Sequence, residues 1–473
     1  MSLDLAIQDA ASGLRATQTQ IQVLSANIAN AQTPGYSEET AAEMSVTTPA
    51  GGVGVETGVI QRVADQLLTA NLATQTSVAA AASATNNYLT QLQSLFGQVG
   101  GSSGFSNALN SFINAMQTDA ATPEDPVAQS AAVNAGQQLA QELNSFSSGI
   151  QSLRASTDSQ IATDVTTLNN AMSTVATLNQ SIVQLQAEGQ SVATLQDQRD
   201  QAVQQMAQLI GVTTYTRPDG TMVVMTAGTG QVLVDGSSVS QFGYTQSGTV
   251  TAGTPMSNLT LNGTDVTSST TSGEIGALLQ LRDTTLPNVT DELNQFTNAL
   301  YNVTTDANLN TTNSGTNVTN DANHFFANVD IAGGLDNAAT IEVNPSLVSD
   351  NGLLYNGISG ADPTIASTIA TNLTANTNFA AAGNFTSGST TNLSNYAAQI
   401  IGQAATSAAA ASQNNTYQSQ LQTEMQNQLQ SETGVNLDQE LMKLTVYQNA
   451  YGASARVIST IQAMYDSLMN IGN

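Results

Sequence analysis

Cysteine and tryptophan are absent from this 473-residue chain, and histidine occurs once. The missing cysteine excludes disulfide bonds and thiolate metal sites. Lysine and arginine together number 8 against 35 acidic residues, which gives a formal net charge of -27. Nucleic-acid binding and docking on an anionic membrane both need clustered cations, so the composition argues against both classes of function.

Charge of either sign is scarce, and long hydrophobic runs are missing. Charged residues make up 9% of the chain, against about 25% in ordinary soluble domains. The polar surface must therefore consist mostly of Gln, Asn, Ser and Thr, which pack against copies of themselves without desolvating a charge. No run of about 18 apolar residues is present, so we expect no transmembrane helix. Asp4 and Asp9 argue against a Sec-type signal, leaving the cytosol or export by another route.

The stretch 437–471 has apolar residues at helical spacing, and it is the strongest pattern in the chain. One stripe contains Leu437, Leu441, Leu444, Tyr451, Ile458 and Tyr465. A neighbouring stripe contains Tyr447, Val457, Ile461, Met464, Leu468 and Ile471. Two stripes are more than a single partner helix can cover. We therefore expect this segment to have apolar neighbours on more than one side.

The stretch 1–30 carries a second amphipathic pattern. Its seam consists of Leu3, Ile7, Ala10, Leu14, Thr17, Ile21, Leu24 and Ile28. This alternation of three and four residues is typical of a coiled coil. The pattern ends at Thr33-Pro34-Gly35, a strong turn signal. We expect the two chain ends to pack together. Two helices of this length would leave much apolar surface bare if they stood alone, which favours further packing between copies over a stalk closed within one chain.

The middle of the chain alternates between helical and β-rich segments. Helices are expected over 61–99, 105–116, 127–188, 192–210, 272–309 and 395–435. The longest of these is either continuous or broken near Gly149 or Thr157. Short strands are expected in 36–60 and within 212–270, where Arg217-Pro218-Asp219-Gly220 is a good hairpin turn. Residues 310–394 are rich in Asn, Thr, Gly and Ser.

These segments predict a mainly α fold with β-rich insertions, organised as nested domains. Residues 1–35 and 436–473 form an inner, coiled-coil-like domain of terminal helices. Residues 36–309 and 395–435 form a middle domain of long helices, with the β-hairpin region at 212–270. Residues 310–394 form a small outer domain rich in β-structure and loops.

No catalytic constellation is visible in the sequence. His324 lacks a second histidine or a cysteine to share a metal ion, so a structural or surface role is expected. A Ser-His-Asp arrangement is not credible with this one histidine in a polar loop. Glu38 and Glu39 lie in a solvated segment after a turn, and the basic residues are scattered singly. We therefore predict no enzyme activity, no metal and no cofactor.

Two motifs near the chain ends resemble the axial proteins of the bacterial flagellum. Residues Leu24-Ser-Ala-Asn-Ile-Ala-Asn30 followed by Thr33-Pro-Gly-Tyr36 are similar to the motif after the first helix of rod, hook and hook-associated proteins. Asn27, Asn30, Pro34, Gly35 and Tyr36 carry this resemblance. Residues 435–440, 447–451 and 468–471 are similar to the matching C-terminal end.

The middle of the chain points to one branch of these proteins. Hook and distal-rod proteins have mostly β middles, whereas this chain has long helices over 61–210. Together with the hairpin at 217–220 and the segment 273–283, these helices resemble the hook-associated protein 1 (FlgK) family of the hook–filament junction. Residues 310–394 match this resemblance least.

The resemblance implies a secreted structural adaptor of the extracellular flagellum, involved in motility and exported by the flagellar type III route with a chaperone. The terminal helices of such proteins order on assembly and pack on neighbouring copies. The residues expected to pair in that inner domain are Leu3, Ile7, Leu14, Ile21, Leu24 and Ile28 with Leu441, Leu444, Tyr451, Ile458, Ile461 and Leu468. The implied partners are further copies in a ring, the hook protein and the second junction protein.

Two alternatives are compatible with the residues. A flagellar hook or distal-rod protein would share the terminal motifs and have a mainly β middle. A secreted adhesin-like or polysaccharide-acting protein with a helical stalk would share only the long helices.

Overall fold

The structure, a computed structural model, describes residues 3–47, 53–97, 104–311, 321–330 and 336–471. It is mainly helical with small sheets, which confirms the fold class at that level. The chain divides into two compact units that are each built from separate segments. Unit 1 comprises Met1–Ala79, Thr166–Phe242 and Gln418–Asn473, and unit 2 comprises Ala80–Val165 and Gly243–Tyr417. The finer, three-domain organisation expected from the sequence stays a prediction.

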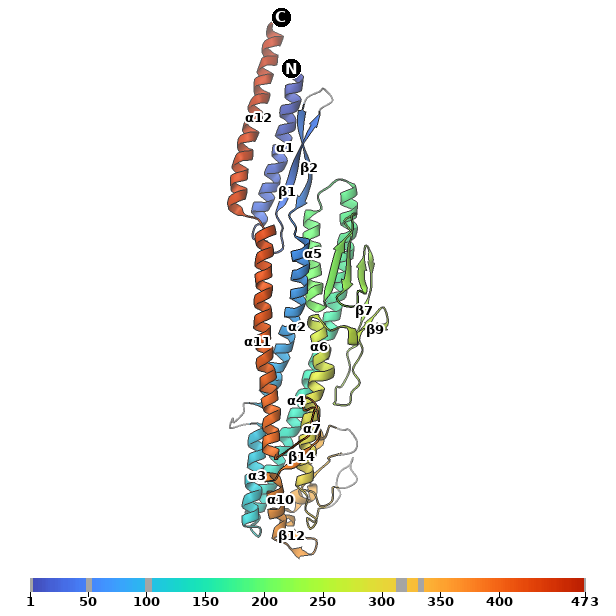
Figure 1. Ribbon diagram of the computed structural model, residues 1–473, viewed down its shortest axis with the longest axis vertical. Helices are drawn as coiled ribbons and strands as arrows, with labels where there is room; N and C mark the ends of the chain where they lie inside the picture. Colours follow the sequence, from blue (N-terminus) through green and yellow to red (C-terminus); the bar gives the residue numbers. More distant parts are fainter. Residues whose placement is uncertain (1–2, 48–52, 98–103, 312–320, 331–335, 472–473) are drawn as a thin grey trace. The chain divides into compact units, whose positions relative to one another are not determined.

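Unit 1 contains both terminal helices, α1 (Leu3–Asn30) and α12 (Leu437–Ile471). They lie side by side and antiparallel, with the two chain ends close to each other (Figure 1). The backbones approach closely where α1 has a glycine, since a Cβ built on Gly13 would lie 3.9 Å from Ser454 Oγ of α12. Small residues at such a position let two helices pack along their length.

A long β-hairpin lies along α1, formed by β1 (Glu39–Thr47) and β2 (Val53–Arg62). The strands are antiparallel, with Glu39 opposite Arg62. The Gln20 side-chain amide of α1 donates a 2.7 Å hydrogen bond to the Ala41 carbonyl of β1. Short strands were expected here, and they are longer because this neighbouring helix covers one side of the hairpin.

The remainder of unit 1 combines helix ends with a small sheet. Helix α5 (Ala193–Leu209) precedes a four-stranded sheet in the order β3-β4-β5-β6. Its strands are β3 (Val212–Thr216), β4 (Met222–Thr226), β5 (Val232–Asp235) and β6 (Ser238–Val239). The turn between β3 and β4 contains Gly220 with a φ of 84°, a conformation that suits glycine. Buried Arg199 of α5 donates to the Gly220 carbonyl at 2.8 Å, which fixes the sheet on the helix.

Three long helices contribute segments to both units: α2 (Gln66–Phe96), α4 (Pro126–Ala187) and α11 (Leu393–Thr433). Helix α4 is continuous over 62 residues. The helix is unbroken at both Gly149 and Thr157, the two positions where the sequence left a break open. Leu95 of α2 packs directly over Gly149. A Cβ at Gly149 would lie 2.9 Å from Leu95 Cδ1.

Unit 2 has one large hydrophobic core around Phe105, Phe112, Phe146 and Phe296. The longer elements of this unit are α3 (Phe105–Ala121), α6 (Gly273–Gln280), the π-helical turn η2 (Leu281–Thr285), α7 (Leu286–Val303) and α10 (Thr364–Thr374). Its shorter helices are η1 (Thr267–Ser269), α8 (Asn337–Thr340), α9 (Pro345–Ser349) and η3 (Asn351–Leu354). The unit boundary falls within β7 (Phe242–Gly243).

The described part of 310–394, for which the sequence predicts a β- and loop-rich outer region, contains both short strands and helices. Just before this region, β8 (Thr260–Leu261) pairs with β9 (Thr264–Asp265). Within its described residues there are three short antiparallel pairs: β10 (Phe326–Ala327) with β11 (Glu342–Val343), β12 (Asn356–Gly357) with β13 (Gly360–Ala361), and β14 (Thr377–Phe379) with β15 (Ser389–Thr391). However, α10 packs on α3 and buries Ile365, Ile369 and Leu373 in the core of unit 2. Their spacing of four residues is a helical signal within an otherwise polar stretch.

Candidate functional site

Most of the residues that the sequence assigned to the seam between α1 and α12 are at least partly buried. Leu24 and Ile461 are buried. Half-buried positions are Leu3, Ile7, Leu14, Ile21, Ile28, Leu444 and Ile458. The side chain of Leu468 lies outside the described residues. Within one chain, these side chains are therefore only partly buried from solvent.

Leu441 and Tyr451 remain exposed in the single chain, although the sequence pattern paired them with α1. Their side chains are 51% and 40% exposed. Leu441 is rotated by about 100° from buried Glu440, which contacts α1 through Asn27. Tyr451 lies eleven residues after Glu440 and therefore has almost the same helical phase, but its side chain is still only partly covered.

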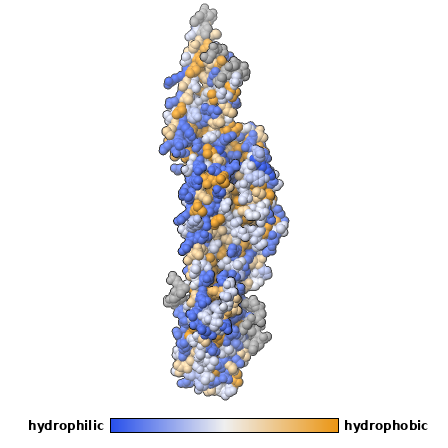
Figure 2. Space-filling view, in the orientation of Figure 1, coloured by the Kyte–Doolittle hydropathy of each residue, from blue (hydrophilic) through white to orange (hydrophobic). Residues whose placement is uncertain are grey.

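A further apolar stripe lies on the exposed side of α12. It comprises Met442, Val446, Ala453, Val457 and Met464, which follow one another at intervals of four and seven residues and are all exposed. In Figure 2, apolar residues appear among hydrophilic ones on the visible face of the terminal helices. Exposed apolar stripes at heptad spacing are typical of a helix that packs on additional helices.

The family-motif residue Asn27 is the centre of a buried polar junction. Its Nδ2 donates to the Glu39 carbonyl at 2.9 Å and to Glu440 Oε2 at 2.9 Å. Its Oδ1 accepts from the Tyr36 hydroxyl at 2.9 Å and from the Glu39 amide at 2.9 Å. Asn27 has no exposed surface, and its amide donors and acceptor are all used. This one side chain therefore connects α1, the following turn, β1 and α12.

Glu440 and Lys443 complete the junction from the side of α12. Lys443 Nζ lies 2.7 Å from Glu440 Oε1 and 2.9 Å from Glu38 Oε1. Buried Glu440 thus receives one cation and one amide donor, which compensates the removal of its charge from water. The sequence offered no signal for this contact, because Asn27 and Glu440 are separated by 413 positions.

The turn after α1 is held on α5. Gly35 has a φ of 76°, and the Pro34 carbonyl accepts a 3.0 Å hydrogen bond from Gln201 Nε2. A Cβ on Gly35 would lie 2.6 Å from that nitrogen, so both the backbone conformation and the close approach require glycine. Asn30, at the end of α1, donates to the Ala26 carbonyl at 3.0 Å.

Two carboxylates of α5 fix the start of the hairpin. Asp197 accepts from the Ser37 amide at 3.0 Å and pairs with Arg62 Nη1 at 2.7 Å, while Asp200 pairs with Arg62 Nη2 at 2.6 Å.

Burial, together with the nearby charges of Glu39, Asp197 and Glu440, raises the pKa of Tyr36 above its ordinary value. Tyr36 is therefore a neutral hydrogen-bond donor to Asn27 at physiological pH.

The segment 273–283 has a structural role in unit 2. Arg282 lies in the π-helical turn and is almost fully buried, with its Nε 2.7 Å from Asp283 Oδ1 and its Nη1 3.5 Å from Asp158 Oδ1. The Tyr244 hydroxyl contacts both Arg282 and Asp158. This network joins α4, the π turn and the preceding loop.

The described residues contain no group of three His, Asp or Glu side chains suited to holding a metal ion. The ring of His324 stacks on Tyr301 with centroids 3.9 Å apart, and its Nδ1 lies 3.3 Å from the Tyr301 carbonyl oxygen. Burial lowers the pKa of His324 below its ordinary value. No described helix combines the length and hydropathy needed to cross a bilayer.

The chain matches three families of flagellar proteins over different segments. The helical domain of the flagellar hook-associated protein FlgK matches residues 89–326. The flagella basal body rod protein family matches residues 7–36, and the flagellar basal body rod FlgEFG protein C-terminal family matches residues 426–471. The last two segments contain most of α1 and α12.

Known proteins that are similar in sequence or structure to this chain are also described as flagellar hook-associated or hook junction proteins. Flagellar hook-associated protein 1 of Salmonella typhimurium is 26% identical over 242 residues, covering 50% of this chain and 43% of that protein. The protein of the same name from Bacillus subtilis is 23% identical over 238 residues, covering 48% and 47%. A structure of the flagellar hook junction protein FlgK from Burkholderia pseudomallei aligns with a TM-score of 0.46 and 27% identity, covering 54% of this chain and 46% of that one.

These matches span less than half the length of the similar proteins from Salmonella typhimurium and Bacillus subtilis. The FlgK helical-domain match alone spans half of the present chain, from the end of α2 through α7 to β10. The chain belongs to the FlgK family of flagellar hook-associated structural proteins.

Proposed function

We propose that this protein is a structural adaptor at the hook–filament junction, where copies assemble into a ring through α1 and α12. The proposed inner domain consists of residues 1–35 and 436–473. The partners are further copies, the hook protein and the second junction protein, and a chaperone accompanies type III export. No catalytic step is part of this function.

The observation that supports the proposal best is the apolar surface that α12 leaves uncovered. Leu441 and Tyr451 lie beside the seam with α1, while Val446 and Val457 lie on the outward stripe and are 63% and 47% exposed. One partner helix covers only one side of α12. Neighbouring copies on both flanks would remove this surface from water, with a contribution of about 25 cal/mol per Å² before the ordering of the helices is subtracted.

Val457→Asp tests the proposal. The substitution places a charge on the outward stripe of α12, at a position that is 47% exposed in the single chain, so the monomer should keep its thermal midpoint. Joining of filaments to hooks should be lost, because a buried carboxylate without a partner costs several kcal/mol. The measurement is the fraction of hooks that bear filaments, counted by electron microscopy in cells producing the variant.

Val348→Asp is the matched control. Val348 has the same 47% exposure as Val457 but lies in α9 of unit 2. We expect normal filaments with this control. Filaments of normal number with Val457→Asp, at normal protein levels, would contradict assembly through α12.

A further inference from the structure

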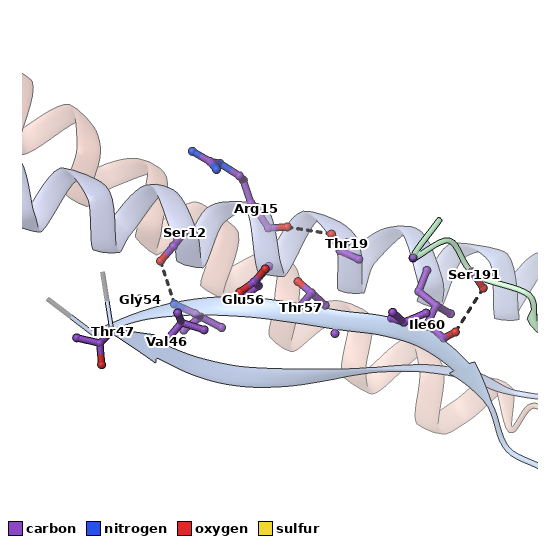
Figure 3. A pocket seen from close by; sticks show the side chains of 15 residues that line it. Ser12, Arg15, Thr19, Val46, Thr47, Gly54, Glu56, Thr57, Ile60 and Ser191 are labelled. Carbon is purple, nitrogen blue, oxygen red and sulfur yellow. Dashed lines mark hydrogen bonds between the residues drawn. The ribbon is translucent and has the colours of Figure 1, made fainter. Parts of the chain in front are cut away.

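An open groove lies between α1 and the β1–β2 hairpin, within unit 1. Its volume is about 570 Å³, and its walls include Ser12, Arg15 and Thr19 of α1 with Val46, Val59 and Ile60 of the hairpin. Figure 3 views the groove with α12 behind α1 and the hairpin, and it shows Arg15 extending from α1 away from the hairpin.

Cations are rare in this chain, and nearly all of them are engaged internally. Six of the eight contact carboxylates or carbonyl oxygens of their own chain: Arg62, Arg154, Arg199, Arg217, Arg282 and Lys443. The other two, Arg15 and Arg456, are exposed on α1 and α12 and form no ion pair among the described residues. The two free cations thus lie on the helices proposed for assembly.

The exposed charges of the two helices form a simple pattern. Helix α1 carries Asp4 and Arg15, and α12 carries Asp438, Arg456 and Asp466. Because the helices are antiparallel and Gly13 is beside Ser454, Arg456 and Arg15 are about four residues apart along the helix axis, or roughly 6 Å. Asp466 and Asp4 are likewise about three residues apart in height, or roughly 5 Å at the rise of an α-helix.

If two copies pack side by side with no shift along the helix axis, Arg456 of one copy is therefore near Arg15 of the other, and Asp466 is near Asp4, so like charges meet across the contact. A shift of the neighbour's α12 by about ten residues toward the start of α1, roughly 15 Å, changes this arrangement. Arg456 of the neighbour then comes within about one turn of Asp4, and its Asp438 within about one turn of Arg15. The same shift moves Asp466 away from Asp4. A single offset thus replaces both repulsions with attractions.

We propose that the groove between α1 and the hairpin receives α12 of a second copy, staggered by this offset and held in register by Arg456–Asp4 and Asp438–Arg15 ion pairs. The occupant presents the stripe containing Val446 and Val457 to the apolar residues of the groove wall, Val46, Val59 and Ile60. Charges beside an apolar seam set the register and orientation of paired helices more than their affinity. This inference rests on the proposed assembly and adds its register.

Charge exchange distinguishes the two registers. In the staggered register, Arg456→Asp and Asp4→Arg should each weaken assembly about two- to fivefold, the range of exposed ion pairs, and the double variant should restore it. In the level register, each single substitution removes a like-charge contact and should strengthen assembly. The measurement is the amount of protein retained on purified hooks as its concentration is varied.

Gln141→Glu is the charge control for this series, because it lowers the net charge at an exposed position of unit 2. Glu56→Gln tests the carboxylate that lines the groove wall, and neither variant should reproduce the loss seen with Arg456→Asp. Unchanged retention of Arg456→Asp and Asp4→Arg, or stronger retention of either, would overturn the staggered register. If Val457→Asp is also retained normally, the proposed function itself fails.

Cross-linking gives a second, independent measurement, since the chain has no cysteine. Two single-cysteine variants, Gln18→Cys and Gln439→Cys, are mixed, assembled on hooks and treated with a short bismaleimide. The staggered register brings these two positions to the same height, whereas the level register would bring Gln18 level with Asn449. Cross-linking of Gln18→Cys to Gln439→Cys in preference to Asn449→Cys is expected. Preference for Asn449→Cys, or no cross-link to either, would overturn the proposal.

Discussion

Single polar side chains decide how the chain ends of this protein meet. Asn27 uses its whole hydrogen-bonding capacity to connect α1, β1 and α12. A buried amide can do this without a charge of its own, and it directs Glu440 toward Lys443. The sequence motif identified Asn27 as important, while its partner Glu440 became apparent only when the two ends were brought together.

Asn27→Asp should destabilise the pairing of α1 with α12. The substitution removes two donors and places a carboxylate beside Glu440, for a loss of about 2–4 kcal/mol. Amide hydrogen exchange along α12 in the assembled protein should become faster. Asn449→Asp, the same change at an exposed position of α12, is the control. Equal exchange rates in the two variants would show that the junction does not stabilise the pair.

Asp119 should make the stability of unit 2 depend on pH. It is fully buried, and neither of its carboxylate oxygens has a hydrogen-bond partner. Burial, with the negative charge of Asp125, raises the pKa of Asp119 to about 7. The folded state therefore keeps the proton over a range in which the unfolded chain releases it, so this group makes folding more favourable as the pH falls from about 7 to about 4.

Asp119→Asn should remove that contribution. The difference in free energy of unfolding between the original chain and the variant should change by up to about 1.4 kcal/mol per pH unit across this range. Glu124→Gln, at an exposed position after the same helix, is the control. The measurement is urea unfolding at several pH values, and a difference that stays constant with pH would contradict the prediction.

At the scale of secondary-structure elements, the glycine in α4 shows what an apolar sequence pattern can and cannot predict. The apolar period of α4 predicted a helix, but it did not decide whether Gly149 breaks it. Packing decides this, because Leu95 occupies the space that a side chain at 149 would need. The π turn at Leu281–Thr285 is a second feature that the apolar period did not predict, and it contains Arg282 with its buried ion-pair contacts.

Gly149→Ala should therefore destabilise unit 2 although alanine is the better helix former. The added methyl group displaces Leu95, and overpacking of this kind costs about 1–3 kcal/mol. Gly402→Ala in α11 is the matched control, because nothing lies within 4 Å of its added Cβ, and it should stabilise by up to about 1 kcal/mol. Denaturant midpoints of the two variants should move in opposite directions, and a stabilised Gly149→Ala would contradict the packing seen at Leu95.

At the scale of the whole molecule, the few cations also determine where trypsin can cut. Six of the eight Lys and Arg residues are held in contacts, while Arg15 and Arg456 are exposed on the terminal helices. If these helices order fully only on assembly, the free monomer should lose both ends first. Mass spectrometry of a time course should show early cleavage after Arg15 and Arg456, and also after Lys443, whose contacts with Glu38 and Glu440 require an ordered α12. No such cleavage is expected in protein assembled on hooks. Early cleavage within unit 2 instead would contradict this order.

The sequence by itself determined the mainly helical class, the existence of both terminal helices and the family motifs, because apolar periodicity and turn residues are local signals. It also indicated that α12 has more apolar surface than one partner covers. Only the tertiary structure decided which face of α12 meets α1, that Asn27 meets Glu440, and that Ile365, Ile369 and Leu373 belong to the core of unit 2. These features depend on contacts between residues far apart in the chain, and a one-residue change of helical phase, about 100°, is enough to exchange a buried side chain for an exposed one.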